Sequence, residues 1–127
     1  MKRNLFTYGT LQFPQVLKKI TGKRFAMAPA VLNGYKRLLV KGTDYPAIIE
    51  NTNSKVYGNL LKNVDQVSMK SIFEFEGIDY ELKHLKVEVG SELFSAVAFV
   101  WRADFNLLDK TDWDKDEFEK KALHFYI

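Results

Sequence analysis

Apolar and polar residues alternate with a period of two over several short stretches of this chain, and turn residues separate those stretches. Asn33-Gly34 lies between two such stretches and predicts a tight hairpin. The turn-rich residues 51–54 predict a second hairpin, and Gly90-Ser91 predicts a third. The expected strands are residues 4–8, 28–32, 35–40, 45–49, 55–61, 80–89 and 93–101. Connections this short favour antiparallel pairing between neighbouring strands.

Three other segments carry helical signals. Pro14 suits the first turn of a short helix, and Asp65 can cap a second helix that Gly77 ends. Residues 111–125 predict a third helix, because oppositely charged side chains recur there four positions apart. Adjacent hairpins with three helices predict an α+β fold with a curled, mostly antiparallel sheet, in one domain of residues 1–127. Periodicity alone does not distinguish an open sheet from a closed barrel.

The second predicted helix carries a carboxylate in its apolar stripe. Met69, Ile72, Phe73 and Glu76 follow the spacing i, i+3, i+4, i+7, whereas Glu74 lies on the polar side. Glu76 is also in the last turn, where the helix dipole disfavours an anion. Burial and the dipole would both raise the pKa of its carboxyl group toward neutrality, which suits a general acid–base. The alternative is that the helix ends earlier and Glu76 pairs with a lysine at the rim.

The first strand ends abruptly in the stretch Leu5–Leu11, "LFTYGTL". A turn of this kind between a strand and a helix exposes unpaired backbone N–H groups, and glycine permits a ligand to approach closely. Gly9, Thr10 and Leu11 are therefore candidates for anion binding, with a turn that binds nothing as the alternative. The chain has no Gly-Lys-Ser/Thr loop and no serine nucleophile elbow, so these motifs give no support for nucleotide or serine hydrolase chemistry.

Composition narrows the chemistry further. The chain has no cysteine, and its two histidines are 40 positions apart, so we expect no disulfide, no thiolate nucleophile and no metal site. No apolar run approaches the roughly 18 residues of a membrane helix, and the first residues lack the apolar segment of a signal peptide. These features predict a cytoplasmic protein without a membrane partner.

Charge is distributed unevenly along the chain. Residues 1–64 contain eleven Lys/Arg and two Asp/Glu, which gives a net charge of +9. Residues 65–127 contain eight Lys/Arg and fourteen Asp/Glu, which gives a net charge of −6. A basic half can attract nucleic acid. However, its lysines are not interleaved with stacking aromatic residues as in single-strand binders. We therefore expect the two halves to interleave in one fold, and nucleic acid is not the expected partner.

Several motifs together indicate a family. "LFTYGTL" is followed by "DYPAII" at 44–49, "VYGNLL" at 56–61 and "IFEFEGIDYEL" at 72–82. In this order and spacing the chain resembles the gamma-glutamyl cyclotransferase-like family over essentially its whole length. The tail, with "AFVW" at 98–101 and "DWDKDEFEKKAL" at 112–123, is most similar to the small members, which include the plant avirulence-induced proteins. The resemblance implies a small β-barrel flanked by helices, and no metal or organic cofactor.

The resemblance also implies a site and a reaction. The family's enzymes cyclise a γ-glutamyl group to 5-oxoproline and release an amine or amino acid. By motif, the catalytic glutamate falls on Glu76, the substrate-holding turn on Tyr8-Gly9-Thr10-Leu11, and a downstream tyrosine on Tyr80. In this interpretation Glu76 transfers protons, backbone N–H groups hold the substrate carboxylate, and the two tyrosines donate hydrogen bonds that orient the substrate.

The chain departs from the family at two positions. Phe73 stands where members often carry aspartate, and Leu82 stands where a basic residue is common. Three hypotheses therefore follow: an enzyme acting on a small γ-glutamyl amine or peptide, a non-catalytic binder of 5-oxoproline or a related acid, and a nucleic-acid-associated domain. Retention of Glu76 favours the enzyme. The sequence specifies no oligomeric state.

Overall fold

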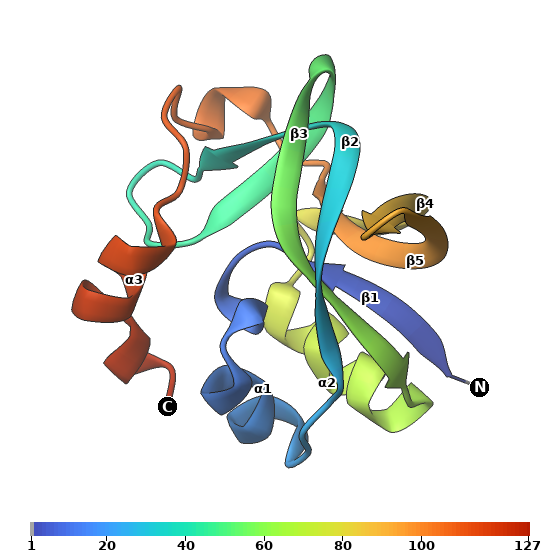
Figure 1. The fold of residues 1–127 in the computed structure, drawn as a ribbon. Helices are drawn as coiled ribbons and strands as arrows, with labels where there is room; N and C mark the ends of the chain where they lie inside the picture. Colours follow the sequence, from blue (N-terminus) through green and yellow to red (C-terminus); the bar gives the residue numbers. More distant parts are fainter. Residues whose placement is uncertain (1) are drawn as a thin grey trace.

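The computed structural model describes residues 2–127, and its centre is a five-stranded sheet that closes on itself (Figure 1). The strands are β1 (Arg3–Thr7), β2 (Met27–Leu39), β3 (Pro46–Val64), β4 (Tyr80–Val89) and β5 (Glu92–Trp101). They follow the order β1-β3-β2-β4-β5 around the barrel. Only the β1–β5 pair is parallel among the described strand pairs, at Leu5 and Val97. The predicted α+β fold with a mostly antiparallel barrel is confirmed.

The region around Asn33-Gly34 differs from the prediction, because β2 and β3 are two long strands and not four short ones. Gly34 adopts a left-handed φ of 83° within β2, and the pairing jumps there from Asn33–Lys55 to Tyr35–Glu50. Residues 51–54 bulge out opposite Gly34. The reversal between the strands lies instead at residues 40–45, where the Val40 N–H donates to the Tyr45 carbonyl at 3.0 Å. A left-handed glycine serves a bulge as well as a turn, and a bulge supplies the curvature that a closed barrel needs.

Two of the predicted helices form as expected. The helix α1 (Pro14–Thr21) begins at its proline and ends at Gly22, which has a left-handed φ of 74°. In α2 (Gln66–Glu76), the Asp65 carboxylate caps the first turn by accepting from the Ser68 N–H at 3.2 Å. The two helices lie side by side against the barrel (Figure 1).

The third helix is shorter than the predicted 111–125. The helix α3 spans Lys115–Lys121, capped by Asp114, and a single 3₁₀ turn (Leu123–Phe125) follows it. The preceding residues are held in an extended form by long-range bonds: the Thr111 carbonyl accepts from the Leu39 N–H at 2.9 Å, and the Trp113 indole donates to the Asp44 carbonyl at 2.8 Å. Tertiary contacts therefore override the local helical pattern here.

The core consists of two apolar clusters separated by the wall of the barrel. One fills the barrel and includes Phe6 and Leu60, and the other joins the wall to the helices and includes Leu5 and Ile72. Consecutive residues of β1 thus face opposite sides of the wall, which explains why the neighbours Leu5 and Phe6 are both apolar and both buried. No helix within residues 2–127 combines the length and the apolar character needed to cross a membrane.

Candidate active site

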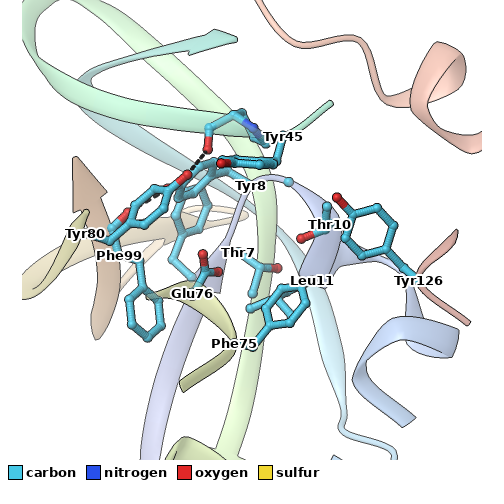
Figure 2. Close-up of a pocket in the computed structure, with 13 residues that line it drawn as sticks. Thr7, Tyr8, Thr10, Leu11, Tyr45, Phe75, Glu76, Tyr80, Phe99 and Tyr126 are labelled. Carbon is cyan, nitrogen blue, oxygen red and sulfur yellow. Dashed lines mark hydrogen bonds between the residues drawn. The ribbon is translucent and has the colours of Figure 1, made fainter. Parts of the chain in front are cut away.

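A cavity of about 200 Å³ lies where β1 leaves the barrel (Figure 2). The turn of residues 8–11 forms one side. The other walls come from the end of α2, the start of β3, the start of β4, the last part of β5 and the C-terminal segment. Ligand sites for drug-sized molecules are typically about 300–1,000 Å³. The volume therefore suits a ligand of amino-acid size.

Among the described residues that line this cavity, Glu76 is the one that carries a carboxyl group on its side chain. It is the last residue of α2, and its side chain is half-buried at the centre of the lining residues (Figure 2). No ion pair or hydrogen bond reaches its carboxylate from any residue between 2 and 127, so the alternative of a lysine partner at the rim is not realised. Desolvation raises the pKa of Glu76 from 4.5 to about 8.

The apolar stripe that singled out Glu76 is only partly buried. Met69 and Ile72 face the core, but Phe73 is 50% exposed and lies against Phe99, with 6.0 Å between the ring centres. Neither Phe73 nor Leu82 lines the cavity in the part of the chain that the structure describes. The two departures from the family motif therefore lie outside the wall that would contact a ligand.

The turn after β1 lines the cavity and carries backbone donors that are unpaired within the described residues. Thr10 starts a single 3₁₀ turn, Thr10–Gln12, with Gly9 just before it. The hydrogen bonds of the turn come from the N–H groups of Gln12 and Phe13, and no described residue accepts from those of Gly9, Thr10 and Leu11. These three N–H groups are the donors that the first turn of a helix always leaves free.

Gly9 is required by a close approach to the opposite wall. A Cβ atom at this position would lie 2.6 Å from Cγ of Pro46, which is closer than nonbonded carbon atoms approach. Pro46 begins β3, so the absence of a side chain at Gly9 lets the turn and the barrel rim meet. The glycine of the motif thus has a packing reason as well as the expected role beside a ligand.

The two predicted tyrosines line the cavity, but their hydroxyl protons are already in use. The Tyr8 hydroxyl donates to the Phe99 carbonyl at 2.6 Å, and the Tyr80 hydroxyl donates to the Pro46 carbonyl at 2.8 Å (Figure 2). Burial raises the pKa of both hydroxyls well above the usual value, and the negative charge of Glu76 adds to the effect. Each tyrosine therefore offers a ligand an accepting oxygen, and the expected donation to substrate would require breaking a bond seen here.

Other lining residues were not predicted from the sequence. Tyr45, Phe75 and Tyr126 also line the cavity. The rings of Phe75 and Tyr126 meet edge to face, with 6.3 Å between their centres, and the Tyr126 hydroxyl donates to Oδ1 of Asp44 at 2.5 Å. Phe75 could have been suggested by its place beside Glu76, whereas a tyrosine next to the C-terminus gives no local signal.

The described residues contain no group of three or more histidine, cysteine, aspartate or glutamate side chains placed to hold a metal ion. The residues that line the cavity bring one carboxyl group, the N–H groups of the turn, and aromatic and threonine hydroxyl groups.

These features define the class of protein: a closed α+β barrel with a small cavity at the end of its first strand. The chain belongs to the gamma-glutamyl cyclotransferase, AIG2-like family, whose model matches residues 5–115. AIG2-like protein C of Arabidopsis thaliana is 31% identical over 126 residues, which cover 98% of this chain and 73% of that protein. Protein AIG2 C of the same plant is 32% identical over 119 residues, covering 91% and 71%.

Solved structures agree with this fold. An Arabidopsis thaliana protein determined in solution superposes with a TM-score of 0.78 at 28% identity, covering 99% of this chain and 78% of that one. A gamma-glutamyl cyclotransferase superposes with a TM-score of 0.70, covering 80% and 68%, and at 16% identity this likeness concerns the fold alone. The family is thus named for an enzyme, and this chain shares its architecture.

Proposed function

We propose that this protein is a γ-glutamyl cyclotransferase that converts the γ-glutamyl group of a small amine or peptide into 5-oxoproline and releases the amine. The observation that carries the proposal is Glu76: a carboxyl group that has no ionic partner within residues 2–127 and lies in a cavity of amino-acid size, another wall of which is a turn with free N–H groups. A purely structural acid at this place would be expected to have a partner.

The proposed reaction needs orientation and proton transfer, and no covalent intermediate with the protein. The α-amine of the substrate attacks its own γ-carbonyl carbon, the new C–N bond closes the five-membered ring, and the bond to the leaving nitrogen breaks. Because both reacting groups belong to one molecule, holding the folded conformer supplies much of the rate enhancement. Glu76 accepts the proton of the attacking amine and delivers it to the leaving nitrogen.

The pKa of Glu76 suits this transfer. The α-amino group of a γ-glutamyl compound lies beside a free carboxylate, so its pKa is above the roughly 7.7–8.0 of an α-amino group at a chain N-terminus. A glutamate whose pKa is raised to about 8 is a stronger base toward this ammonium group than an ordinary glutamate, and a pKa near the working pH is the condition under which general acid–base catalysis is most efficient. Such a group typically contributes a factor of about 10²–10⁴ in rate.

The other predicted residues hold the substrate. The N–H groups of Gly9, Thr10 and Leu11 bind the α-carboxylate, which supplies the negative charge that such donors favour. The hydroxyl oxygens of Tyr8 and Tyr80 accept hydrogen bonds from the α-amine and direct it toward Glu76. This assignment replaces the donor role expected from the sequence, because both hydroxyl protons are bonded to main-chain carbonyls.

The remaining walls bear on the leaving group. Tyr45, Phe75 and Tyr126 supply aromatic surface, and no lysine or arginine lines the cavity within residues 2–127. Desolvation first, and then the charges of Asp79 and Asp44, raise the pKa of Tyr45, so this side of the cavity is electronegative. We expect γ-glutamyl conjugates of neutral or cationic amines to be better substrates than conjugates of amino acids, whose leaving group carries a free carboxylate. The value of kcat/KM should be higher for the amine conjugates by at least about tenfold.

One experiment tests both statements. The protein is incubated with γ-glutamyl conjugates of a neutral amine, a diamine and glycine, and 5-oxoproline is measured by mass spectrometry. Glu76→Gln serves as the inactive comparison, and Glu74→Gln, which changes an exposed acid on the same helix, serves as the matched control. Turnover that is equal in the parent and in Glu76→Gln would refute the proton-transfer role. Binding of 5-oxoproline without turnover of any conjugate would favour the non-catalytic binder.

A further inference from the structure

Arg37 lies behind the turn that is proposed to hold the substrate carboxylate. It is on β2, where it pairs with Ile48, and its side chain is only 16% exposed. Its Nη1 donates to the Tyr8 carbonyl at 2.8 Å, while Nε and Nη2 donate to the two carboxylate oxygens of Asp112 at 2.8 and 3.2 Å. The guanidinium also lies over the Trp113 ring, 5.3 Å from its centre. Arg37 itself does not line the cavity in the described chain.

We propose that Arg37 is a positioning residue that keeps the Gly9 N–H directed into the cavity; the proposal rests on the function proposed above. The Tyr8 carbonyl and the Gly9 N–H belong to one planar peptide unit, in which the two groups point in opposite directions. Arg37 holds the carbonyl on the side away from the cavity. The N–H of the same unit is thereby fixed toward the cavity, where no described residue accepts from it.

The charge of Arg37 adds a second effect. A hydrogen bond from a cation polarises the peptide unit that accepts it, and this makes the N–H at the other end of that unit a stronger donor. Asp112 offsets the net charge and fixes the guanidinium plane through both of its oxygens, and Trp113 supports one face. Lysine supplies a single point charge without this planar fork, so it would not reproduce the arrangement.

The same contacts connect the turn to the C-terminal wall of the cavity. Trp113, beneath the guanidinium, donates through its indole to the Asp44 carbonyl, and Asp44 accepts from the Tyr126 hydroxyl. The C-terminal segment that supplies Tyr126 is thus anchored next to the residue that orients the turn. Loss of Arg37 is expected to loosen both features, with the larger effect on the turn that it contacts directly.

The inference predicts a particular kinetic change. An interaction with the α-carboxylate is made equally in the bound substrate and in the transition state, so weakening it raises KM and leaves kcat nearly unchanged. We expect Arg37→Met to raise KM and the Kd for 5-oxoproline by about tenfold or more, whereas Glu76→Gln lowers kcat. Lys36→Met, the neighbouring position on β2, is the matched control and should change neither constant.

The test combines calorimetric titration with 5-oxoproline, steady-state kinetics and the ¹H–¹⁵N resonance of Gly9. Arg37→Met should shift the Gly9 amide resonance even without ligand. Asp112→Asn keeps the arginine and its bond to Tyr8, so it should shift the Gly9 resonance less than Arg37→Met does and in the same direction. If Arg37→Met does not fold, the Asp112→Asn variant alone decides whether Arg37 positions the Gly9 N–H. Unchanged Gly9 resonance and unchanged Kd in both variants would overturn the inference. A parent protein that neither binds nor forms 5-oxoproline would instead refute the proposed function, and the Gly9 resonance would still decide the role of Arg37.

Discussion

Helix α2 carries a carboxylate at each end, and the two are in opposite electrostatic situations. At the N-terminus, hydrogen bonding from Ser68 together with the ion pair to Lys23 lowers the pKa of Asp65 far below its usual range. At the C-terminus, desolvation raises the pKa of Glu76 to about 8. The start of the helix offers free N–H donors that stabilise an anion, whereas Glu76 at the other end is desolvated and has no donor within residues 2–127, so the same functional group is favoured as an anion at one end and as a neutral acid at the other.

The largest expected effect separates the two carboxylates by function. Glu76→Gln should lower turnover by a factor of about 10²–10⁴ and leave stability intact or increased, because an uncharged amide is easier to bury. Asp65→Ala should lower the free energy of unfolding by about 1 kcal/mol through loss of the cap and leave turnover unchanged. Rates of 5-oxoproline formation and urea unfolding of both variants check this. A loss of turnover in Asp65→Ala with its fold intact would contradict the comparison.

The second prediction uses pH, which should act on the two ends with opposite sign. Between pH 4.5 and about 8 the folded protein holds a proton on Glu76 that the unfolded chain has released, so this group makes stability fall as pH rises. The lowered pKa of Asp65 contributes stability that is complete above the usual value of 3.8 and is lost as pH falls below it.

Urea unfolding at about pH 5 and about pH 8 measures this difference. The free energy of unfolding of Glu76→Gln, relative to that of the parent, should be higher at the upper pH than at the lower pH. The amount by which Asp65→Ala is less stable than the parent should be the same at both pH values. If the parent and Glu76→Gln have the same pH dependence, Glu76 does not carry the raised pKa.

The smallest effect comes from giving Glu76 a partner. Phe73 precedes it by one helical turn and is half-exposed, so Phe73→Lys places an ammonium group on the same face of α2. A pair of this kind contributes about 0.2–0.5 kcal/mol, which lowers the pKa of Glu76 by about 0.3. The acidic limb of the plot of kcat/KM against pH should move to lower pH by the same amount as the pKa. Phe73→Met, which lacks the charge, should leave the limb in place.

Local signals predicted the parts of the fold that local chemistry determines. Pro14, Asp65 and Gly77 mark helix ends in both the sequence and the structure, because caps depend on a few neighbouring residues. Asn33-Gly34 was misleading, since a left-handed glycine fits a turn and a bulge equally well. Residues 111–114 were wrongly assigned to a helix, because bonds to residues far away in the sequence hold them extended.

The residues of the candidate site also fall into those that a local pattern predicts and those that only tertiary contacts show. Glu76 was predicted as a site residue because a charge in an apolar stripe violates a local pattern; the structure shows that it lines the cavity, and its role stays a prediction. Arg37 and Tyr126 carry no such signal. Their contacts near the cavity form only when the barrel brings β1, β2 and the C-terminal segment together, as in the bond between Arg37 and the Tyr8 carbonyl.

The parallel pairing of β1 with β5 has a consequence for how the molecule is assembled. The Tyr8 hydroxyl and the Phe99 carbonyl that it reaches are 91 positions apart, and closing so long a loop is slow compared with forming hairpins. A nascent chain can complete the hairpins between β2 and β3 and between β4 and β5 before its first strand has both neighbours. The cavity therefore comes into existence only with the final closure, so that ligand binding during refolding would report the last structural event and not an early one.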